Sequence, residues 1–326
     1  MIDFLRTFVI IKNKYSFPGR AEMSKYDPEE VVRVAWYYYV ESYTQKQISD
    51  LLAINRTKVI RLLEYAKETG VVSFKLNQSD NKRLKLEKEL MDKFKLNDVC
   101  LVPRSETLVN LNESLAVATA MYIINRMPDV HYINVGYGDT LNRVINHLAA
   151  SIDRPINFVS LTGGVNYYLP SFSKRFNANL NLIPSPLLLS KEETRNALIQ
   201  DSSVVEIQKM VDLSDTTVVG IGGLNDDATI VKNGILSKND LRLLQMMGSV
   251  GDVLSHFLDE KGDLISSDLE KRLISTSLDR LRKLDNVIGV SGGSNKVSAI
   301  LSVLKGKYIN VLITDETTGE QLIAKE

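Results

Sequence analysis

Three segments near the start of the chain carry apolar residues at the three- and four-residue spacing of amphipathic helices. The first follows Asp27 and the second follows Thr44, two residues whose side chains can cap a helix, and the third ends near Gly70. Ala53 and Ile54 form a short turn between the second and third segments. The pattern therefore predicts three short helices. Their apolar positions are Val31, Val34, Ala35 and Tyr38, then Ile48, Leu51 and Leu52, then Val59, Leu62 and Leu63.

The pattern changes beyond the third segment. Alternating apolar residues in "VVSFKL", residues 71–76, predict a small strand, or wing. After the charged stretch "DNKRLKLEKEL" come short β-rich runs, most of them followed by glycine and a helical pattern: "HYINVGYGDT", "INFVSLTGGV", "TTVVGIGGLN", "NVIGVSGGSNK" and "YINVLITDETT". Strands that alternate with helices predict a parallel sheet with helices on its faces. In such sheets ligands bind at the carboxyl ends of the strands.

The length of 326 residues corresponds to about two domains at the usual ~150 residues each. We predict an α/β protein in which residues 1–22 form a disordered extension. Residues 23–78 form a winged helix-turn-helix, and residues 79–326 form a Rossmann-like domain with a parallel sheet. We assign no function to the extension, since Met23, just ahead of the first predicted helix, is an alternative start of translation.

Charge and cysteine content narrow the class of protein. Forty Lys and Arg residues balance forty Asp and Glu residues, so any surface for nucleic acid has to be local. The single cysteine, Cys100, cannot form an internal disulfide, and the chain lacks a secretory signal; both features indicate the cytoplasm. The apolar stretch "FLRTFVII" is shorter than the ~20 residues that span a bilayer. We therefore expect a cytoplasmic protein with no membrane partner.

A short second helix, a tight turn and a third helix with its apolar side inward match the helix-turn-helix, which presents its third helix to the major groove of DNA. Polar side chains then lie on the outer and leading faces, where Arg and Asn can pair with guanine and adenine, and Lys and Thr can meet phosphates. Gln45 begins the second helix and would lie near the DNA backbone. The candidate DNA-binding residues are Gln45, Asn55, Arg56, Thr57, Lys58 and Arg61.

Two other interpretations of this helix remain open. Its polar residues could form a solvated face, as most charge clusters do, or the whole unit could bind a protein. The order of capped helices, turn and wing favours DNA. Residues 23–78 hold eight basic and seven acidic residues, a net charge of plus one, so a single copy would bind weakly. We expect two or more copies to bind a repeated or palindromic operator in double-stranded DNA.

Glycine loops after the predicted strands form the second candidate site. Glycine lets the backbone approach an anion and point its N–H groups at it, above all where a helix begins. The loops "GYGDT" (136–140), "TGG" (162–164) and "GGSNK" (292–296) have this form, although each taken alone could be a tight turn. Lys296 can meet a phosphate, and Asp252 can accept hydrogen bonds from sugar hydroxyls. None of the loops has the Walker or complete dinucleotide spacing, so ATP and NAD do not fit and we expect no cofactor.

Several motifs, in the same order, resemble the SorC/DeoR family of bacterial sugar-responsive transcriptional regulators. The likeness covers about residues 27–324 and is carried by "TQKQISDLLAINRTKVIRLLEYAKETGVVSFKL", "VGYGDT", "LTGGV", "VVGIGG", "GSVGDVLSHFLDEKGDLI", "GVSGGSNKVSAI" and "LKGKYINVLITDE". The stretch "LTGGVNYYLPSFSKRFNANLNLIPSPLLLS" is most similar to the branch that contains the repressor of the autoinducer-2 uptake operon.

The resemblance implies a second domain similar in fold to sugar-phosphate isomerases, which binds a phosphorylated sugar or a polyol phosphate as effector. It also implies a homo-oligomer, a tetramer, with contacts from the segment "LKLEKELMDKF" and the effector domain. Autoinducer-2 phosphate, sorbitol or sorbose phosphate and a pentose phosphate all stay open as effectors. Within the site, Tyr137 and Asp139 are the candidates for ligand selection. The other effector-site residues that the resemblance implies are Gly136, Gly138, Thr140, Thr162, Gly163, Gly164, Gly222, Asp252 and Lys296.

The similarity to isomerases raises the alternative that the chain is a sugar-phosphate isomerase. Asp226, Asp227, Asp252 and Lys296 could form an acid–base set. The histidines at positions 131, 147 and 256 fit structural roles better, and the sequence has no His/Cys cluster or spaced carboxylate loop for a metal. Since a sensor has to hold its ligand rather than convert it, we favour a transcriptional regulator, a repressor, without catalytic residues.

Overall fold

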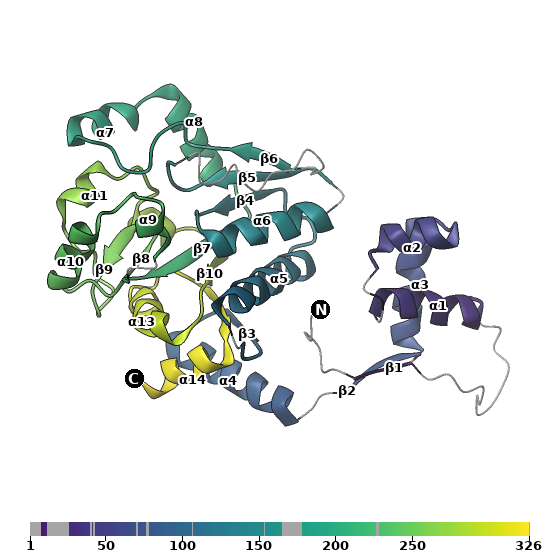
Figure 1. Cartoon of the computed structure of the whole chain (residues 1–326). Coiled ribbons are helices and arrows are strands. Elements are labelled where there is room, and N and C mark those ends of the chain that lie inside the picture. The colour runs from purple at the N-terminus through teal and green to yellow at the C-terminus, as the bar shows by residue number, and fades with distance from the viewer. Residues whose placement is uncertain are drawn as a thin grey trace. The chain divides into compact units, whose positions relative to one another are not determined.

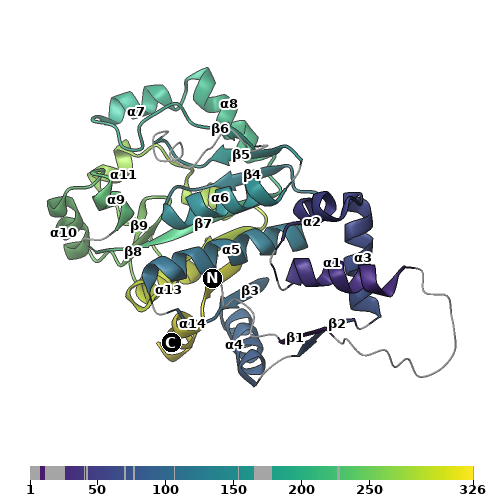
Figure 2. The same ribbon diagram turned by 45° about the vertical axis from the view of Figure 1, so that its right-hand side comes forward.

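A computed structural model of the chain describes residues 8–11, 26–39, 41, 43–69, 71–75, 78–105, 107–152, 154–164, 178–225 and 228–325. The chain divides into two compact units, Met1–Lys82 and Arg83–Glu326 (Figures 1 and 2). The division falls inside the helix α4 (Gln78–Phe94).

Three helices lie wholly within the described part of the N-terminal unit: α1 (Pro28–Tyr39), α2 (Gln45–Leu52) and α3 (Arg56–Glu68). Thr44 caps α2 in a reciprocal capping box with Gln47, and Ala53 ends it in the left-handed conformation, with a φ angle of 52°. Tyr38 and Leu51, which the periodicity predicts to face the core, are instead 36% and 53% exposed. The three positions predicted for α3, Val59, Leu62 and Leu63, are all buried. The buried residues of this core are Val31, Val34, Ala35, Ile48, Val59, Leu62, Leu63, Ala66 and Val72.

A pair of antiparallel strands completes this unit. β2 (Val72–Lys75) is the strand that the alternation predicts, and it pairs with β1 (Phe8–Ile11). β1 lies within residues 1–22, for which the sequence predicts a disordered extension; the rest of that segment is outside the described residues. Four apolar residues are too few to show a period, and this strand is fixed by a partner far along the chain, so local pattern alone does not reveal it.

A nine-stranded sheet forms the centre of the second unit. Seven parallel strands lie in the order β3-β11-β10-β7-β4-β5-β6, and the short antiparallel strands β8 and β9 extend from the end of β7. This confirms the predicted α/β class with a parallel sheet. The strands are β3 (Asp98–Val102), β4 (Tyr132–Val135), β5 (Ile156–Ser160), β6 (Ala178–Asn181), β7 (Thr216–Gly223), β8 (Gly251–Val253), β9 (His256–Leu258), β10 (Val287–Val290) and β11 (Val311–Asp315).

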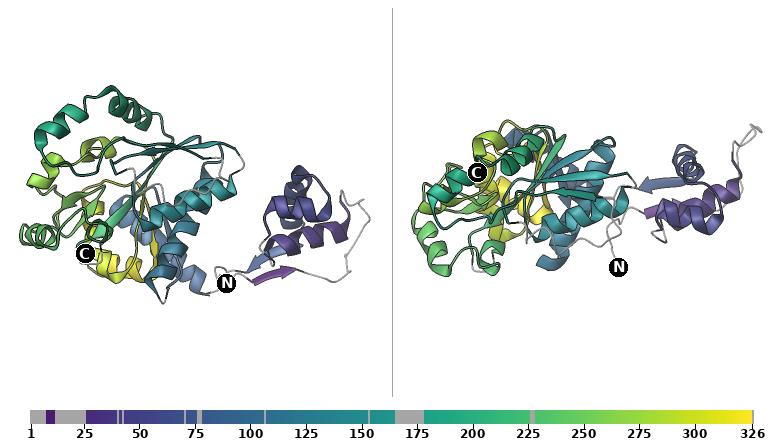
Figure 3. Two further views of the ribbon diagram at one scale, coloured as in Figure 1. Left: turned by 45° about the horizontal axis from the view of Figure 1, so that its top comes forward. Right: turned by 90° about the horizontal axis from the view of Figure 1, so that it is seen from above.

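Helices cover both faces of the sheet (Figure 3). α5 (Leu108–Arg126) and α6 (Asp139–Ser151) pack against each other on one face, while α8 (Ser202–Val211) and α13 (Val297–Lys305) lie on the other, as right-handed crossovers require. No helix in the described part of the chain is long and apolar enough to cross a membrane. The remaining helices are α7 (Glu192–Leu198), α9 (Thr229–Lys232), α10 (Lys238–Met246), α11 (Asp268–Arg272), α12 (Leu278–Leu281), the short 3-10 helix η3 (Ser294–Lys296) and α14 (Glu316–Ala324).

The direction of the chain across the sheet reverses between β4 and β7. From β4 the chain proceeds outward through β5 and β6, returns to the other side of β4 at β7, and continues through β10 and β11. At such a reversal the loops that follow the two central strands leave toward opposite faces. The carboxyl ends of β4 and β7 are therefore where an open α/β sheet binds its ligand.

Candidate functional site

The predicted glycine loops follow strands of the parallel sheet, so they share one edge of it. Gly136 follows β4, the 162–164 loop follows β5, Gly222 lies at the end of β7, and the 292–296 loop follows β10. Because β4 and β7 are neighbours in the parallel sheet, the Gly136 and Gly222 positions lie at the same reversal point. The fold thus brings together residues that lie far apart in the sequence.

Asp252 lies at the end of β7, beside this edge. It is the middle residue of β8, directly opposite Gly222 in the antiparallel pair that extends β7. A Cβ atom at Gly222 would lie 2.0 Å from Oδ1 of Asp252, so only glycine leaves room for the carboxylate in this position. The other carboxylate oxygen accepts a hydrogen bond of 3.1 Å from the N–H of Ser255. The β7–β8 pair and this hydrogen bond fix the orientation of the Asp252 carboxylate.

The electrostatic environment couples Asp252 to Lys296. Burial raises the pKa of the Asp252 carboxyl to about 6, while the Ser255 N–H and the charges of Lys296 and His256 act in the opposite direction. Burial lowers the pKa of the Lys296 ammonium group, and the negative charges of Asp252 and Asp139 oppose that shift. Both groups keep some solvent contact. An acceptor and a cation therefore face a region of low dielectric, where an incoming anion or hydroxyl would interact strongly with them.

The loop that carries Lys296 is held by Asp315. The N–H of Gly293 donates to Asp315 Oδ2 at 3.0 Å and to Thr318 Oγ1 at 2.8 Å, and the Thr318 hydroxyl donates to the same carboxylate at 2.5 Å. A Cβ at Gly292 would come within 2.6 Å of Asp315 Oδ2. Asp315 is buried and also caps α14. Sequence reasoning missed this residue, although an Asp at a strand end followed three residues later by Thr is an available capping signal.

The loop after β4 begins α6 and carries the residues that we expect to select the ligand. Gly138 precedes the helix with a φ angle of 142°, a conformation that favours glycine. Asp139 accepts hydrogen bonds from Arg143 and Asn112, and Arg143 also pairs with Glu113. The hydroxyls of Tyr137 and Ser255 lie 3.2 Å apart, which links this loop to the turn after Asp252. Thr140, in the first turn of α6, is partly buried.

The other glycines serve the packing of the backbone. The N–H groups of Gly136, Gly163 and Gly164 donate to the carbonyl oxygens of Val218, Ile274 and Ser185 respectively. A Cβ at Gly163 would lie 2.4 Å from the carbonyl oxygen of Pro186. Neighbouring Thr162 is buried and bridges to Ser275. These glycines therefore shape the edge, whereas the polar groups that point into it come from other residues.

In the N-terminal unit, three of the predicted DNA-binding residues at the start of α3, namely Asn55, Arg56 and Lys58, have partners within the unit. Asn55 accepts the N–H of Lys58 at 2.8 Å through its side-chain oxygen, so it caps α3. The Lys58 ammonium group lies 2.7 Å from the Glu30 carboxylate on α1. The side chains of Thr57 and Arg61 are exposed and have no hydrogen bond or ion pair with any described residue.

Arg56 is paired with another predicted DNA-binding residue. Its Nε donates to Oε1 of Gln45 at 3.2 Å. The side chain of Gln45, the first residue of α2, thus reaches the first residue of α3. The sequence predicts Gln45 near the DNA backbone, and the structure adds this contact within the protein.

Of the four residues suggested for an acid–base set, the structure describes Asp252 and Lys296, which interact electrostatically at the sheet edge. Asp226 and Asp227 lie outside those residues. His256 is buried, with one ring nitrogen bonded to Glu270 at 2.8 Å and the other to the carbonyl oxygen of Thr276 at 2.9 Å. His147 lies 2.7 Å from Glu113 on α5, and no three His, Cys, Asp or Glu side chains of the described ranges gather as a metal site would require.

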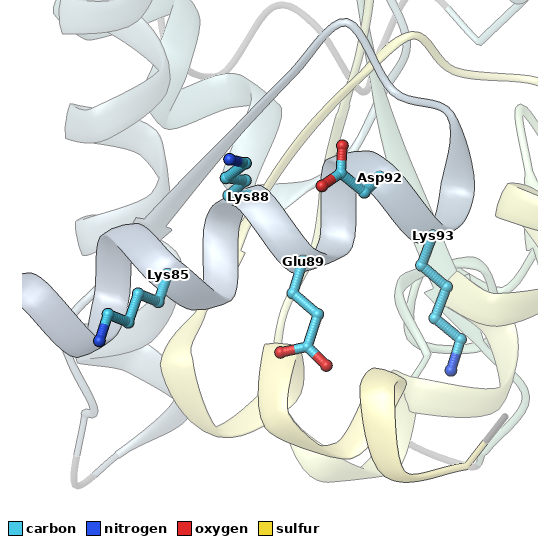
Figure 4. A pocket seen from close by; sticks show the side chains of 5 residues that line it. All are labelled: Lys85, Lys88, Glu89, Asp92 and Lys93. Atoms are coloured by element: carbon cyan, nitrogen blue, oxygen red, sulfur yellow. The ribbon is translucent and has the colours of Figure 1, made fainter.

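A separate depression runs along the exposed side of α4 (Figure 4). Its side chains carry both signs of charge and none belongs to a glycine loop; they are Lys85, Lys88, Glu89, Asp92 and Lys93. Lys93 also donates to the carbonyl oxygen of Ile323 on the neighbouring α14. We regard the sheet edge, where two partly buried charges lie together, as the stronger candidate for a ligand site, because this depression is lined by one solvated helix face.

Comparison with known proteins adds the following. A family model described as "Putative sugar-binding domain" matches residues 79–324. The chain is 34% identical over 303 residues to the transcriptional regulator LsrR of Enterobacter sp. (strain 638), covering 91% of this chain and 94% of the relative. It is 31% identical over 308 residues to LsrR of Escherichia coli (strain K12), covering 93% and 97% respectively. The crystal structure of the full-length sorbitol operon regulator SorC from Klebsiella pneumoniae aligns with a TM-score of 0.67 and 27% identity, covering 92% of this chain and all of that one.

Proposed function

The chain belongs to the family of sugar-binding transcriptional regulators, and from this premise we propose that it is a repressor whose grip on operator DNA is controlled by a phosphorylated sugar. Its N-terminal unit is a winged helix-turn-helix that binds DNA through α3. The edge of the parallel sheet binds the effector. The regulator interpretation, rather than the isomerase, agrees with the curated relatives, which are regulators of transcription.

One observation carries the proposal for the effector site. Asp252 and Lys296 converge at the carboxyl ends of β7 and β10, next to the point where the chain reverses its direction across the sheet. The charge of each group shifts the pKa of the other. A phosphorylated sugar supplies both matching groups, since its hydroxyls can donate to the carboxylate and its phosphate can pair with the ammonium group. The first turns of α6 and α13 supply positive helix ends at the same edge.

The proposal for DNA binding rests on the α3 surface. Arg56, Thr57 and Arg61 are exposed along the leading face of a helix whose other side is buried in a small core. The β1–β2 pair supports the assignment of a wing. With little net charge in the unit, we propose that copies assemble, as a tetramer, so that two or more α3 helices bind one operator. A protein that binds the chromosome works in the cytoplasm.

Control of DNA binding requires only a difference in affinity. If the sugar phosphate binds the free protein more tightly than the DNA-bound protein, it releases the operator by the ratio of those affinities. The same linkage means that DNA weakens binding of the sugar phosphate by an equal factor. Tyr137 and Asp139 select which sugar binds, because their side chains differ in shape and charge from the glycines around them.

The experiment is binding of the purified full chain to DNA from upstream of its own gene, followed by fluorescence anisotropy at fixed salt. Phosphorylated and unphosphorylated forms of the same sugars are added, including autoinducer-2, sorbitol, sorbose and pentoses. We expect sequence-selective binding that only phosphorylated forms weaken. Turnover of sugar phosphates that is abolished by Asp252→Asn would instead establish the isomerase.

A further inference from the structure

The orientation of Asp252 depends on the two-residue turn between β8 and β9. The central residues of that turn, Leu254 and Ser255, have φ angles of 53° and 65°. Two-residue hairpin turns favour such left-handed angles, which Asn and Gly adopt most easily. Because Leu and Ser adopt them at a cost, the turn needs support from the structure around it. The Ser255 N–H donates to the Asp252 carboxylate at 3.1 Å, so a change in the turn would move that carboxylate.

This support comes from the segment of residues 270–276. The Ser275 hydroxyl donates to the carbonyl oxygen of Leu254 at 2.9 Å. The carbonyl oxygen of Thr276 lies 2.9 Å from Nε2 of His256, the residue that directly follows the turn. The segment therefore contacts the turn through a backbone group on one side and through a buried imidazole on the other.

The same segment holds the loop after β5. The N–H of Thr276 donates to the carbonyl oxygen of Leu161 at 2.8 Å, and the N–H of Gly163 donates to the carbonyl oxygen of Ile274 at 2.9 Å. Two loops of the candidate effector site are thus joined through one short stretch of chain. A change in how His256 binds this stretch would reach the effector site.

The contacts of His256 require one proton more than a neutral imidazole beside a carboxylate provides. Nδ1 lies 2.8 Å from Oε1 of Glu270 on α11, and Nε2 faces the Thr276 carbonyl oxygen. Both partners accept hydrogen bonds, whereas a neutral imidazole has a single N–H. Unless the ring or the Glu270 carboxyl holds a further proton, a nitrogen lone pair faces an oxygen. Since His256 is buried, water does not readily replace the lost contact.

Glu270 and Asp252 are the charged groups that bear on His256 from the elements around it. Asp252 lies on the paired strand β8, and the charge of His256 acts on its carboxyl group. Arg272, on the same helix as Glu270, is paired within that helix. α13, which packs against β9, has Lys305 as its charged residue, exposed at the C-terminal end of the helix. The proton held by His256 and Glu270 is therefore balanced by carboxylates.

We propose that His256 is a positioning residue for effector binding, which fastens the Asp252 turn to residues 270–276 through a proton shared with Glu270. The inference rests on the proposed function of the sheet edge. Loss of the proton makes one of the two imidazole contacts repulsive, so the left-handed turn loses a support and the Asp252 carboxylate is held less firmly for sugar hydroxyls. The affinity for a sugar phosphate should therefore be higher while the pair holds the proton and fall as pH rises.

Glu270→Gln tests this, because an amide can satisfy the ring in both of its states. Its NH₂ group can donate to Nδ1 of a neutral imidazole, and its oxygen can accept from a protonated one. Binding to the full chain is measured by calorimetry at about pH 6 and about pH 9. The probes are phosphorylated autoinducer-2, sorbitol phosphate, sorbose phosphate and ribose phosphate.

From the lower to the higher pH, the natural protein should lose about three- to tenfold more affinity than Glu270→Gln. The comparison isolates the shared proton, since the titrations of Asp252, Lys296 and the phosphate group of the probe occur in both proteins. His131→Gln is the matched control. It removes an exposed histidine that precedes β4, and its pH profile should match that of the natural protein. Operator affinity without sugar phosphate should agree within about twofold among the three proteins, which checks that each is folded.

Two outcomes would overturn the inference while leaving the proposed function intact. One is the same pH dependence of sugar-phosphate affinity in the natural protein and in Glu270→Gln. The other is an equal loss of affinity in Glu270→Gln at both pH values, which would make Glu270 a structural residue only. If the natural protein bound none of the four phosphates at either pH, the proposed function would fail, and this inference with it.

Discussion

In the N-terminal unit the candidate functional groups are long side chains on an exposed helix, whereas in the α/β unit they are a partly buried carboxylate and ammonium group beside glycines. Arg56 and Arg61 extend from α3 over a core of a few residues. The Asp252 carboxylate can occupy its position only because Gly222 has no side chain. The α3 surface is defined by the polar groups of its long side chains. The sheet edge is defined by the space that glycines leave around Asp252. Substitutions should therefore act through lost contacts in one unit and through steric displacement in the other.

The largest expected effect separates the two units. Leu62 is fully buried in the small core of the N-terminal unit, so Leu62→Ala should cost about 2–5 kcal/mol. A unit of this size has little stability to lose. We expect DNA binding to disappear while sugar-phosphate binding, measured by calorimetry, stays within about twofold. Leu51→Ala, at a position that is 53% exposed, is the control and should change stability by less than about 0.5 kcal/mol. Loss of both activities in Leu62→Ala would contradict the division.

A substitution of a glycine tests the steric account of the sheet edge. Gly222→Ala should lower the affinity for the sugar phosphate at least about tenfold, because the new methyl group displaces the Asp252 carboxylate. Gly220→Ala is the matched control in the same strand, since its Cβ would meet only the Leu141 side chain, at 3.7 Å. Calorimetric titration of both variants with the same sugar phosphate makes the comparison. Equal affinities would show that Asp252 does not need its present position.

The raised pKa of Asp252 predicts that this residue destabilises the fold at neutral pH. The folded protein holds the proton up to a pKa of about 6, against a usual value of 3.8, so stability falls as pH rises from about 4 to 6. Asp252→Asn cannot ionise. Since the pKa of about 6 already includes the attraction to Lys296, the variant should be more stable than the natural protein by up to about 3 kcal/mol at pH 7.5 and nearly equal to it at pH 4. Denaturant unfolding at several pH values measures this. A variant that is less stable at pH 7.5 would show that the carboxylate is held favourably.

The smallest effect concerns Asn55, for which the structure adds a capping role to the predicted contact with DNA. Asn55→Ala should lower the stability of the N-terminal unit by about 1 kcal/mol, because the N–H of Lys58 loses its partner. Asn55→Asp should retain that stability, since Asp caps equally well, yet weaken DNA binding by repulsion from phosphates. A loss of stability in the Asp variant equal to that in the Ala variant would argue against the cap.

Local pattern predicts the helices α1, α2 and α3 and the strands β2, β4, β5, β7, β10 and β11, because short-range spacing determines them. Thr44, Val59 and Leu62 act within one turn or one helix face, and the glycines mark strand ends directly. The pairs that define the sites could not be predicted in this way. Asp252 meets Gly222 through a strand pairing, and Asp315 supports the Gly293 loop from the next strand.

For some residues predicted to contact DNA, the structure adds a partner within the protein. A polar residue such as Asn55 or Lys58 can bond to DNA or to its own protein, and sequence alone does not say which is nearer. β1 shows the same limit for the backbone, since its pairing with β2 depends on a segment distant in sequence.

The central claim is that the two sites are coupled, and a reciprocal pair of titrations tests it most directly. The affinity for operator DNA is measured with and without saturating sugar phosphate, and the affinity for the sugar phosphate with and without saturating operator DNA. Linkage predicts that both ratios are equal and exceed about five. An operator affinity that does not change at saturating sugar phosphate would contradict the account.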